Sequence, residues 1–297
     1  MPDLIADAAA IVAALPPITL STEIVSATTP ASPPASSTPP TPVTPVVPVP
    51  PEASQYTHSL ISDFTTQPLD TADWTVEVYN VSADKDQQSP WGRSAAASNV
   101  VSTPSGLELW VRSQLVDGGT KVSTSEINSV RRDILYGTFR VGMTIPYVPG
   151  SCAAFFYYRD DASEIDLEFL SQDASAGKHP MYFVLHDVKG DQGPAPAPLT
   201  PSAEIRSPSF QAVNLATDLT SSVHEYRFDW APEGISFYFD GVLLASYTDP
   251  AAIPSKPGML AFNHWSNGNK YWTRGPPTQD SKFVITYVHA WFNTAAG

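Results

Sequence analysis

The stretch Glu164-Ile165-Asp166-Leu167-Glu168-Phe169 alternates strictly between acidic and apolar side chains. Successive side chains of a β-strand point to opposite faces, so the three acids share one face and the three apolar residues share the other. The apolar face belongs in a hydrophobic core. The sequence therefore predicts a strand that is buried on one side and presents a row of carboxyl groups on the other.

The spacing of the two outer acids fits a particular kind of chemistry. At about 3.3 Å per residue the α-carbons of Glu164 and Glu168 lie roughly 13 Å apart, and each side chain can lean inward by roughly 4 Å. The remaining gap is near the roughly 5 to 5.5 Å that a retaining glycosidase needs between its nucleophile and its acid/base. A solvated strand face that happens to be acidic is the alternative. Stacked carboxylates repel each other, however, and stability alone gives no reason to place them together.

The overall charge limits the classes of partner. The 297 residues include 16 basic and 30 acidic side chains, which gives a formal net charge of −14. This excess argues against nucleic acid and anionic membranes as partners and suits a neutral polymer substrate. The apolar stretch Ala8–Leu15 is too short to span a bilayer and has no basic residue ahead of it, so it predicts neither a membrane span nor a convincing signal peptide.

Residues 1–55 are expected to be a low-complexity segment and linker. From Thr28 to Pro51 nearly every residue is Pro, Ser, Thr, Ala or Val, a composition that cannot bury enough apolar surface to fold. We expect this disordered extension to act as a spacer of polyproline II character. From Tyr56 the composition becomes globular, and residues 56–297 are long enough for one sizeable core, at about 240 residues.

The single cysteine, Cys152, excludes an internal disulfide and any cluster of cysteines around a metal. It precedes an aromatic stretch, so we interpret it as a buried core thiol and not as a nucleophile. The sequence contains no motif that specifies a cofactor or a metal ion, and we expect neither.

The globular part is predicted to be all-β. No long stretch has an apolar period of 3.6 residues, whereas short alternating runs recur between Gly and Pro residues. Many antiparallel strands of this kind favour a β-jelly-roll sandwich of two curved antiparallel sheets. Asp240-Gly241 is a strong hairpin signal between two of them. The candidate strands are Trp74–Tyr79, Gly106–Ser113, Gly137–Met143, Ala153–Tyr158, Glu164–Leu170, Met181–Asp187, Glu225–Trp230, Ile235–Phe239, Val242–Tyr247, Met259–His264 and Phe283–Phe292.

The stretch Asn263–Trp272 is dense in aromatic residues, amides and glycines. Asn263 and Trp265 lie close to Trp272 in the sequence. Sugar rings pack their flat C–H faces on aromatic rings, and their hydroxyl groups need polar side chains, so this stretch is a candidate carbohydrate-binding surface. A hydrophobic corner is the alternative and would bring fewer amides. Trp91, which is followed by Gly and Arg, is a second candidate for carbohydrate binding, with fewer polar neighbours to support it.

The candidate strand Met181–Asp187 adds one titratable group. Met181 and Leu185 alternate with Tyr182 and His186, so one face belongs to the core and the other can enter a cleft. A lone histidine in a strand is more often a structural residue whose hydrogen bonds are satisfied within the protein. We keep His186 as a candidate substrate-binding residue.

With these residues in hand, the chain resembles glycoside hydrolase family 16, the β-jelly-roll glucanases and transglycosylases. The block Glu164–Glu168 is similar to the E-x-D-x-E catalytic strand of that family. The resemblance implies Glu164 as nucleophile, Glu168 as general acid/base and Asp166 as the carboxyl that tunes both. It also implies that Glu126, on the strand before, contacts substrate.

What the resemblance implies about function is an endo-acting, retaining hydrolase of β-1,3 or mixed β-1,3/1,4-glucan. A cell-wall transglycosylase with the same residues is the alternative, and a non-catalytic lectin is a third interpretation. Polysaccharide is the expected partner, and we expect a monomer that works outside the cell or in the cell wall. Family members often carry a structural Ca²⁺, but no ligand pattern in this sequence is specific enough to predict one.

Overall fold

The structure is a computed structural model that describes residues 50–84, 89–186, 205–206 and 209–295. The chain divides into two units, Met1–Val47 and Pro48–Gly297, and every described residue belongs to the second. Most of the expected N-terminal segment therefore lies outside the described residues. Its last part, Pro51–Gln55, forms the short 3-10 helix η1. No helix in the described part of the chain is long and apolar enough to cross a membrane.

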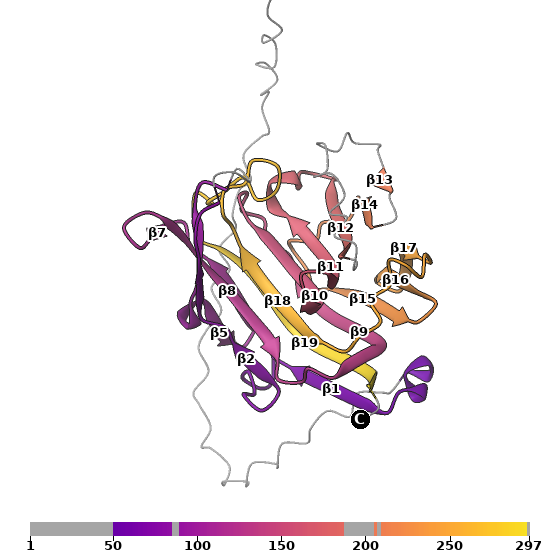
Figure 1. Ribbon diagram of the computed structural model, residues 1–297. Coiled ribbons are helices and arrows are strands. Elements are labelled where there is room, and N and C mark those ends of the chain that lie inside the picture. Colours follow the sequence, from indigo (N-terminus) through magenta and orange to yellow (C-terminus); the bar gives the residue numbers. More distant parts are fainter. Residues whose placement is uncertain (1–49, 85–88, 187–204, 207–208, 296–297) are drawn as a thin grey trace, which may run out of the picture. The chain divides into compact units, whose positions relative to one another are not determined.

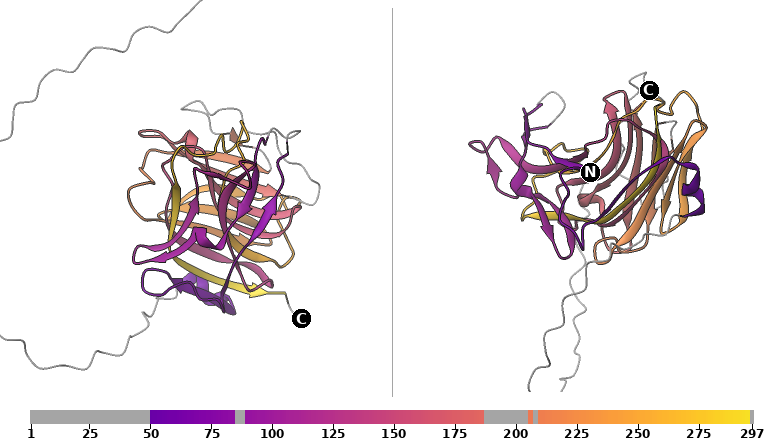
Figure 2. Two further views of the ribbon diagram at one scale, coloured as in Figure 1. Left: turned by 90° about the vertical axis from the view of Figure 1, so that its left-hand side faces the viewer. Right: turned by 90° about the horizontal axis from the view of Figure 1, so that it is seen from below.

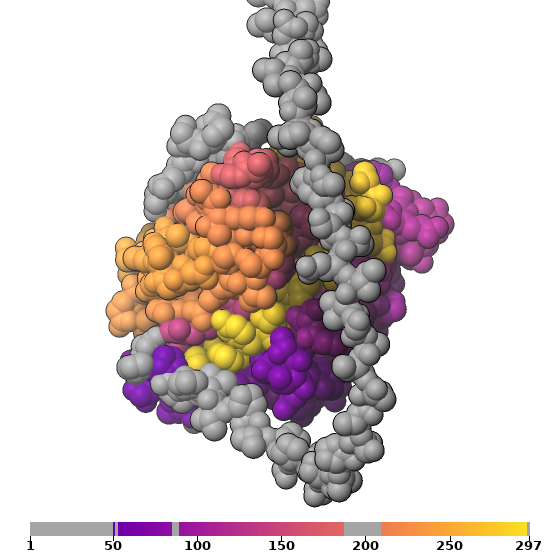
Figure 3. Space-filling model, turned by 180° about the vertical axis from the view of Figure 1, so that it is seen from behind, coloured from indigo at the N-terminus to yellow at the C-terminus, as the bar shows by residue number. Residues whose placement is uncertain are grey.

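One of two sheets in the second unit has eight strands among the described residues. They are β1 (His58–Asp63), β5 (Val100–Thr103), β6 (Gly106–Val111), β9 (Ile134–Thr144), β15 (His224–Ala231), β16 (Gly234–Phe239), β17 (Val242–Tyr247) and β19 (Ser281–Thr294). Their order is β17-β16-β15-β9-β19-β6-β5, with β1 also paired to β19 (Figure 1). Seen from behind, β15–β17 form much of the orange surface (Figure 3).

The other sheet has eleven strands in the described part of the chain. They are β2 (Trp74–Val76), β3 (Tyr79–Val81), β4 (Gly92–Ala95), β7 (Leu115–Val116), β8 (Lys121–Ser129), β10 (Cys152–Asp160), β11 (Ser163–Leu170), β12 (His179–His186), β13 (Ile205–Arg206), β14 (Phe210–Leu215) and β18 (Met259–Trp265). Their order is β13-β14-β12-β11-β10-β18-β8-β4-β3, and β2 and β7 also pair with β8. Only the β4–β8 pairing, among those described, is parallel. Figure 2 shows the two sheets from two further directions.

The predicted all-β jelly-roll sandwich is confirmed, and most predicted strands are present to within a few residues. The interval Trp74–Tyr79 is instead divided between β2 and β3. Strand β12 is described as far as His186, so Asp187 lies outside the described residues. Several short strands with little alternation, such as β1, β4 and β5, were not predicted. Asp240 and Gly241 form the expected hairpin turn with φ of 45° and 79°, the positive values that a type I′ turn requires.

Aromatic rings from the two sheets meet in the core between them. The centroids of Phe155 and Phe228 lie 5.1 Å apart, and those of Phe183 and Phe237 lie 4.5 Å apart. Each pair joins a strand of the eleven-stranded sheet to a strand of the eight-stranded sheet. Such pairs contribute roughly 0.5–1.5 kcal/mol beyond the area that they bury.

The same core fixes the register of β11. Ile165 and Leu167 are completely buried and Phe169 is 2% exposed. Burial of each such side chain contributes roughly 1.5–3 kcal/mol. A slip by one residue would move all three out of the core and the acids into it, so the core holds the carboxyl groups on the outer face of the sheet.

Candidate active site

The predicted acids share the outer face of the eleven-stranded sheet with alternate residues of four neighbouring strands. We call this surface the acid face. It is made by Glu164, Asp166 and Glu168 of β11, Cys152, Ala154, Phe156 and Tyr158 of β10, Tyr182, Val184 and His186 of β12, Met259, Ala261, Asn263 and Trp265 of β18, and Glu126 and Asn128 of β8.

One cross-strand row joins three of the predicted site residues. Glu168 is paired with Ala154 on one side and with Tyr182 on the other. Beyond Ala154 the row continues through Asn263 to Glu126. Paired residues of adjacent strands project from the same face. The register therefore places Glu126 and Asn263 on the same line across the sheet as Glu168.

Glu164 and Asp166 form a coupled pair of carboxyl groups. Their side chains are 18% and 7% exposed. Burial raises the pKa of Glu164 to about 8 and the pKa of Asp166 well above its ordinary value, and the neighbouring acids add to both shifts. A hydrogen bond joins the two side chains. One of them must therefore carry a proton, because ionised carboxylates only accept hydrogen bonds.

Glu168 has different surroundings. Burial raises its pKa to about 7, opposed by hydrogen bonds from Cys152 and from the indole of Trp272. The Cys152 Sγ lies 3.2 Å from Glu168 Oε1. Burial is thus the main cause of the raised pKa of Glu168.

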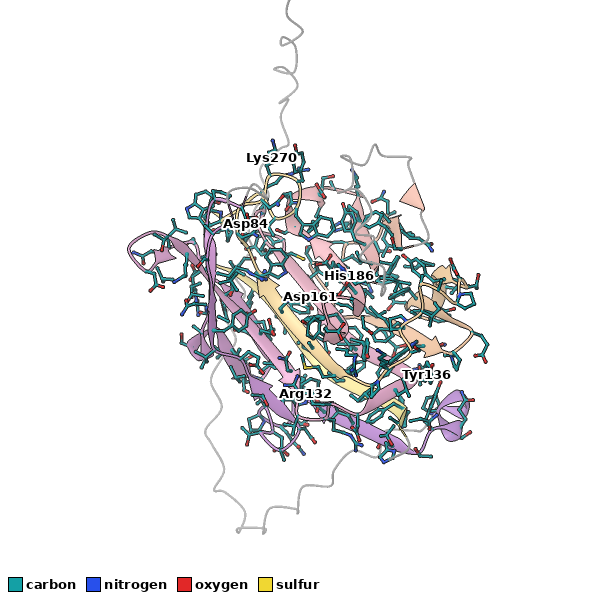
Figure 4. The ribbon with its side chains drawn as sticks, viewed as in Figure 1. Asp84, Arg132, Tyr136, Asp161, His186 and Lys270 are labelled. Carbon is teal, nitrogen blue, oxygen red and sulfur yellow. The ribbon has the colours of Figure 1, made fainter. Side chains whose placement is uncertain are left out.

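His186 faces the acids, as its alternation with core residues predicted. Its Nε2 lies 3.8 Å from Glu164 Oε2 and 3.5 Å from Asp166 Oδ2. Burial lowers the pKa of His186, while the charge of Asp161 acts in the opposite direction. Figure 4 labels His186 and Asp161, which lie close together near the start of β11.

Glu126 is held by two neighbouring side chains at the β8 end of the row. The Tyr79 hydroxyl donates a hydrogen bond of 2.6 Å to Oε2, and Asn128 Nδ2 donates one of 3.3 Å to Oε1. Burial raises the pKa of Glu126. This acid lies three strands from β11, where it can contact a ligand that extends across the sheet.

Two of the predicted tryptophans pack on the acid face. Both Trp265 and Trp272 lie against the buried cluster that contains Cys152. The Trp272 ring is 5.7 Å from the Tyr182 ring. The guanidinium of Arg93 stacks on Trp265 at 4.7 Å from the ring centroid. The structure therefore brings Trp265 and Trp272 to the neighbourhood of Glu168.

Trp91 is not brought to the acids. It precedes β4, four strands from β11, and its ring lies against Gly268, where an added Cβ would come within 2.3 Å of ring atoms. Its backbone N–H donates to Asn267 O at 3.2 Å. By contrast, Asn263 does lie on the acid face, and its Oδ1 is buried without a hydrogen-bond partner among the described residues.

A cavity of about 270 Å³ opens beside the Glu164 end of the acid face. It is lined by Arg132, Tyr158, Arg159, Asp160, Pro257 and Gly258. Among these residues Tyr158 lies on the acid face, where it is the cross-strand partner of Glu164.

Glu164, Asp166 and His186 are the described residues that could share a cation, since their ligand atoms lie within 4.8 Å of one another. The family resemblance implies a catalytic role for the same two carboxyl groups, and we infer no metal centre.

Three side chains of the site were not predicted. Tyr79 binds Glu126, Tyr182 donates to Asp173 Oδ2 at 2.7 Å, and Cys152 donates to Glu168. Alternation places Tyr182 on the same face as His186, a signal that could have identified it. Cys152 and Tyr158 lie on the same face of β10, because they are an even number of residues apart. Only the register between β10 and β11 shows that this face is the one that carries the acids.

The sequence profile of Glycosyl hydrolases family 16 matches residues 85–288. A β-glucanase of Paenibacillus polymyxa is 31% identical over 136 residues, which are 44% of this chain and 48% of the relative. Congo red hypersensitive protein 1 of Saccharomyces cerevisiae is 25% identical over 138 residues, or 46% of this chain and 24% of the relative. The chain thus spans about half or less of the length of these curated relatives.

Solved structures share the fold. The Bacillus licheniformis β-glucanase has a TM-score of 0.61 at 24% identity, over 80% of this chain and 99% of that one. The Crh5 transglycosylase has a TM-score of 0.55 at 16% identity, over 81% and 90%. The fold is thus that of a β-jelly-roll sandwich. The chain belongs to glycosyl hydrolases family 16, since the family profile covers more than half of it.

Proposed function

We propose that the protein is a retaining, endo-acting glycoside hydrolase that cleaves a β-glucan with β-1,3 or mixed β-1,3/1,4 linkages. The observation that carries this proposal is the set of three carboxyl groups that one strand of a family 16 domain presents side by side. The β-glucanases among the relatives support the class of substrate.

In the first step Glu164 attacks the anomeric carbon. A bond forms between its carboxylate oxygen and that carbon while the glycosidic C–O bond breaks, and Glu168 gives its proton to the leaving oxygen. In the second step water attacks the same carbon and loses a proton to Glu168. The ester bond breaks, and Glu164 leaves as a carboxylate.

Asp166 stabilises the ionised form of Glu164. A nucleophile must be ionised, yet in the free protein burial raises the pKa of Glu164 above that of Glu168. The hydrogen bond between Glu164 and Asp166 lowers the pKa of Glu164 and raises that of Asp166. Asp166 therefore keeps the shared proton, and its O–H donates a hydrogen bond to the ionised Glu164 carboxylate. The acids titrate as a coupled set.

The remaining predicted residues bind sugar units along the acid face. Trp265 and Trp272 offer flat rings near Glu168, and Asn263 and Glu126 offer polar groups further along the row. His186 contacts a sugar on the Glu164 side. Trp91 supports the far end of the surface through its contact with Gly268. An elongated polysaccharide is the ligand that reaches all of these positions.

A cell-wall transglycosylase is the second candidate, because the tryptophans beside Glu168 could hold an acceptor sugar. The acceptor hydroxyl would then replace water in the second step. Both candidates place the protein outside the cell or in the cell wall, where the polysaccharide lies, and both are compatible with a monomer.

The test is incubation with laminarin, lichenan, xyloglucan and chitin-type oligomers, followed by mass-resolved product analysis. Hydrolysis of laminarin or lichenan with a steady rise in reducing ends supports the glucanase. Redistribution of chain length at nearly constant reducing ends supports the transglycosylase. A lectin would bind an oligomer without changing its length, and binding without turnover would overturn both enzyme proposals.

A further inference from the structure

Cys152 lies in direct contact with a proposed catalytic group. It is completely buried, as the sequence led us to expect, but on the acid face and outside the main core. Its partner across the strands is Leu170, which makes it the diagonal neighbour of Glu168. Its Sγ lies 3.2 Å from Glu168 Oε1, within hydrogen-bond distance for sulfur.

We propose that Cys152 is a positioning residue for Glu168: its thiol donates a hydrogen bond that holds the carboxyl group in the orientation needed to protonate the leaving oxygen. The catalytic consequence rests on the proposed function, whereas the hydrogen bond does not.

The thiol is a donor and not a thiolate. Burial and the neighbouring Glu168 and Asp166 raise the pKa of Cys152 well above its ordinary value, so sulfur keeps its proton at neutral pH. A carboxylate oxygen accepts that proton in a hydrogen bond. Complete burial also separates the sulfur from substrate and from solvent oxidants, which excludes a nucleophilic or redox role.

Two donors converge on Glu168 from different elements. Cys152 reaches it from β10, and the Trp272 indole reaches it from the loop before β19. The Tyr182 hydroxyl, across the strand on β12, is engaged by Asp173, which in turn pairs with Arg274 at 3.4 Å. Asp166 and Glu164 on its own strand interact with the charge of Glu168, and Glu126 of β8 lies on the same cross-strand row. Two described cations lie near this part of the acid face, Arg93 against Trp265 and Arg274 against Asp173. Orientation of the carboxyl group therefore depends on the thiol and the indole.

The hydrogen bond is tested directly by the infrared S–H stretching band. The chain has a single cysteine, so this band has one source. In the whole protein at pH 8 the band should lie at lower frequency than in Glu168→Gln. It should rise in frequency as the pH falls through about 7, where Glu168 gains a proton and becomes a weaker acceptor. A band that responds neither to the substitution nor to pH would overturn the proposal.

Catalysis is tested with three substitutions on a glucan that the wild type cleaves. Cys152→Ala and Cys152→Val both remove the donor but leave different volumes, and each should lower kcat roughly tenfold with little change in KM. Cys152→Ser keeps a donor and should recover most of the rate. Removal of the donor raises the pKa of Glu168, so the alkaline limb of the pH–rate profile should move to higher pH in Cys152→Ala.

Equal rates in the serine and alanine variants, or an unchanged kcat in Cys152→Ala, would contradict the positioning role. If the wild type cleaves no glucan, the proposed function fails, and the infrared band still decides whether the thiol donates to Glu168.

Discussion

The three carboxyl groups of β11 differ in surroundings although they alternate along five residues. Glu164 is hydrogen-bonded to Asp166 and lies near His186, whereas Glu168 receives hydrogen bonds from Cys152 and Trp272. Chemically similar acids acquire different roles when their environments differ. At this scale the partners of each carboxyl group, more than its identity, determine what it can do.

The first prediction concerns the outer two acids. Glu164→Gln and Glu168→Gln should each lower turnover of a β-glucan by at least roughly a thousandfold, because each removes a group that bonds to the reacting atoms. Glu233→Gln, in an exposed hairpin turn, is the matched control and should keep the wild-type rate. Circular dichroism checks that all three variants are folded. Ordinary activity in either active-site variant would remove the assignment.

The second prediction concerns the cost of burying Asp166. Its pKa is raised well above 3.8 in the folded protein, so as the pH rises above about 4 the folded state holds a proton that the unfolded state releases. Stability is then lost as the pH rises further. Asp166→Asn removes the loss and should raise the Tm at pH 7 by roughly 2–4 °C, for about 1 kcal/mol, with little effect near pH 4. A Tm gain that is independent of pH would contradict this account.

At the scale of elements, the β10–β11 hairpin shows what the sequence could predict and what it could not. Alternation correctly predicted the two faces of β11, whereas the sequence from Cys152 to Tyr158 does not alternate and left the faces of β10 unassigned. In a regular hairpin with a two-residue turn at Asp161-Ala162, Arg159 would pair with Glu164. A bulge instead pairs Tyr158 with Glu164, which brings Cys152 to the acid side of the sheet. Nothing local in the sequence reveals that bulge, and so the contact between Cys152 and Glu168 could not be predicted.

The same limit applies to the ends of the acid face. The aromatic stretch after β18 was predicted as a binding surface, but the approach of Trp272 to Glu168 depends on the path of the loop that carries it. Likewise, the contact between Tyr79 and Glu126 joins residues from β3 and β8. Contacts of this kind depend on tertiary geometry and leave no periodic signal.

The third prediction tests the loop that supports Trp91. Gly268 has a φ of +74° and no room for a Cβ beside the Trp91 ring, whereas Gly177 has a φ of +71° and open space around it. The two alanine variants thus share the backbone strain, and they differ in what the new Cβ meets, which at position 268 is the Trp91 ring and the Gly275 carbonyl oxygen. Gly268→Ala should weaken binding of a long oligosaccharide several-fold beyond Gly177→Ala, and titration calorimetry measures the difference. Equal affinities would mean that Trp91 does not support the binding surface.

At the scale of the whole molecule, the fold followed from short alternating strands, and the family followed from the acidic motif together with other matching segments, such as the one that contains Glu126. The net charge of −14 is compatible with a neutral substrate and does not select one. Which sugar is bound depends on the details of loops and cavities, such as the one beside Tyr158. The sequence pattern specifies the layers of the molecule and not these surfaces.

The fourth prediction concerns the N-terminal segment. Removal of residues 1–47 should leave the Tm within about 1 °C of the wild-type value, because the composition becomes globular only from Tyr56. Removal of residues 1–55 also deletes η1 and Ala53, which is 2% exposed, and should lower the Tm by roughly 2–4 °C. Differential scanning calorimetry compares the two truncated proteins. A large fall in Tm on the shorter deletion would show that residues 1–47 stabilise the domain.

The most direct test of the proposed mechanism is peptide mass mapping of a trapped intermediate. Glu168→Ala lacks the group that activates water, so an aryl β-glucoside oligomer with a good leaving group should glycosylate the nucleophile without rapid turnover. The account predicts a glycosyl adduct on the peptide that contains Glu164, at that residue. An adduct at a different residue, or release of the aryl group with no adduct at any time, would contradict it.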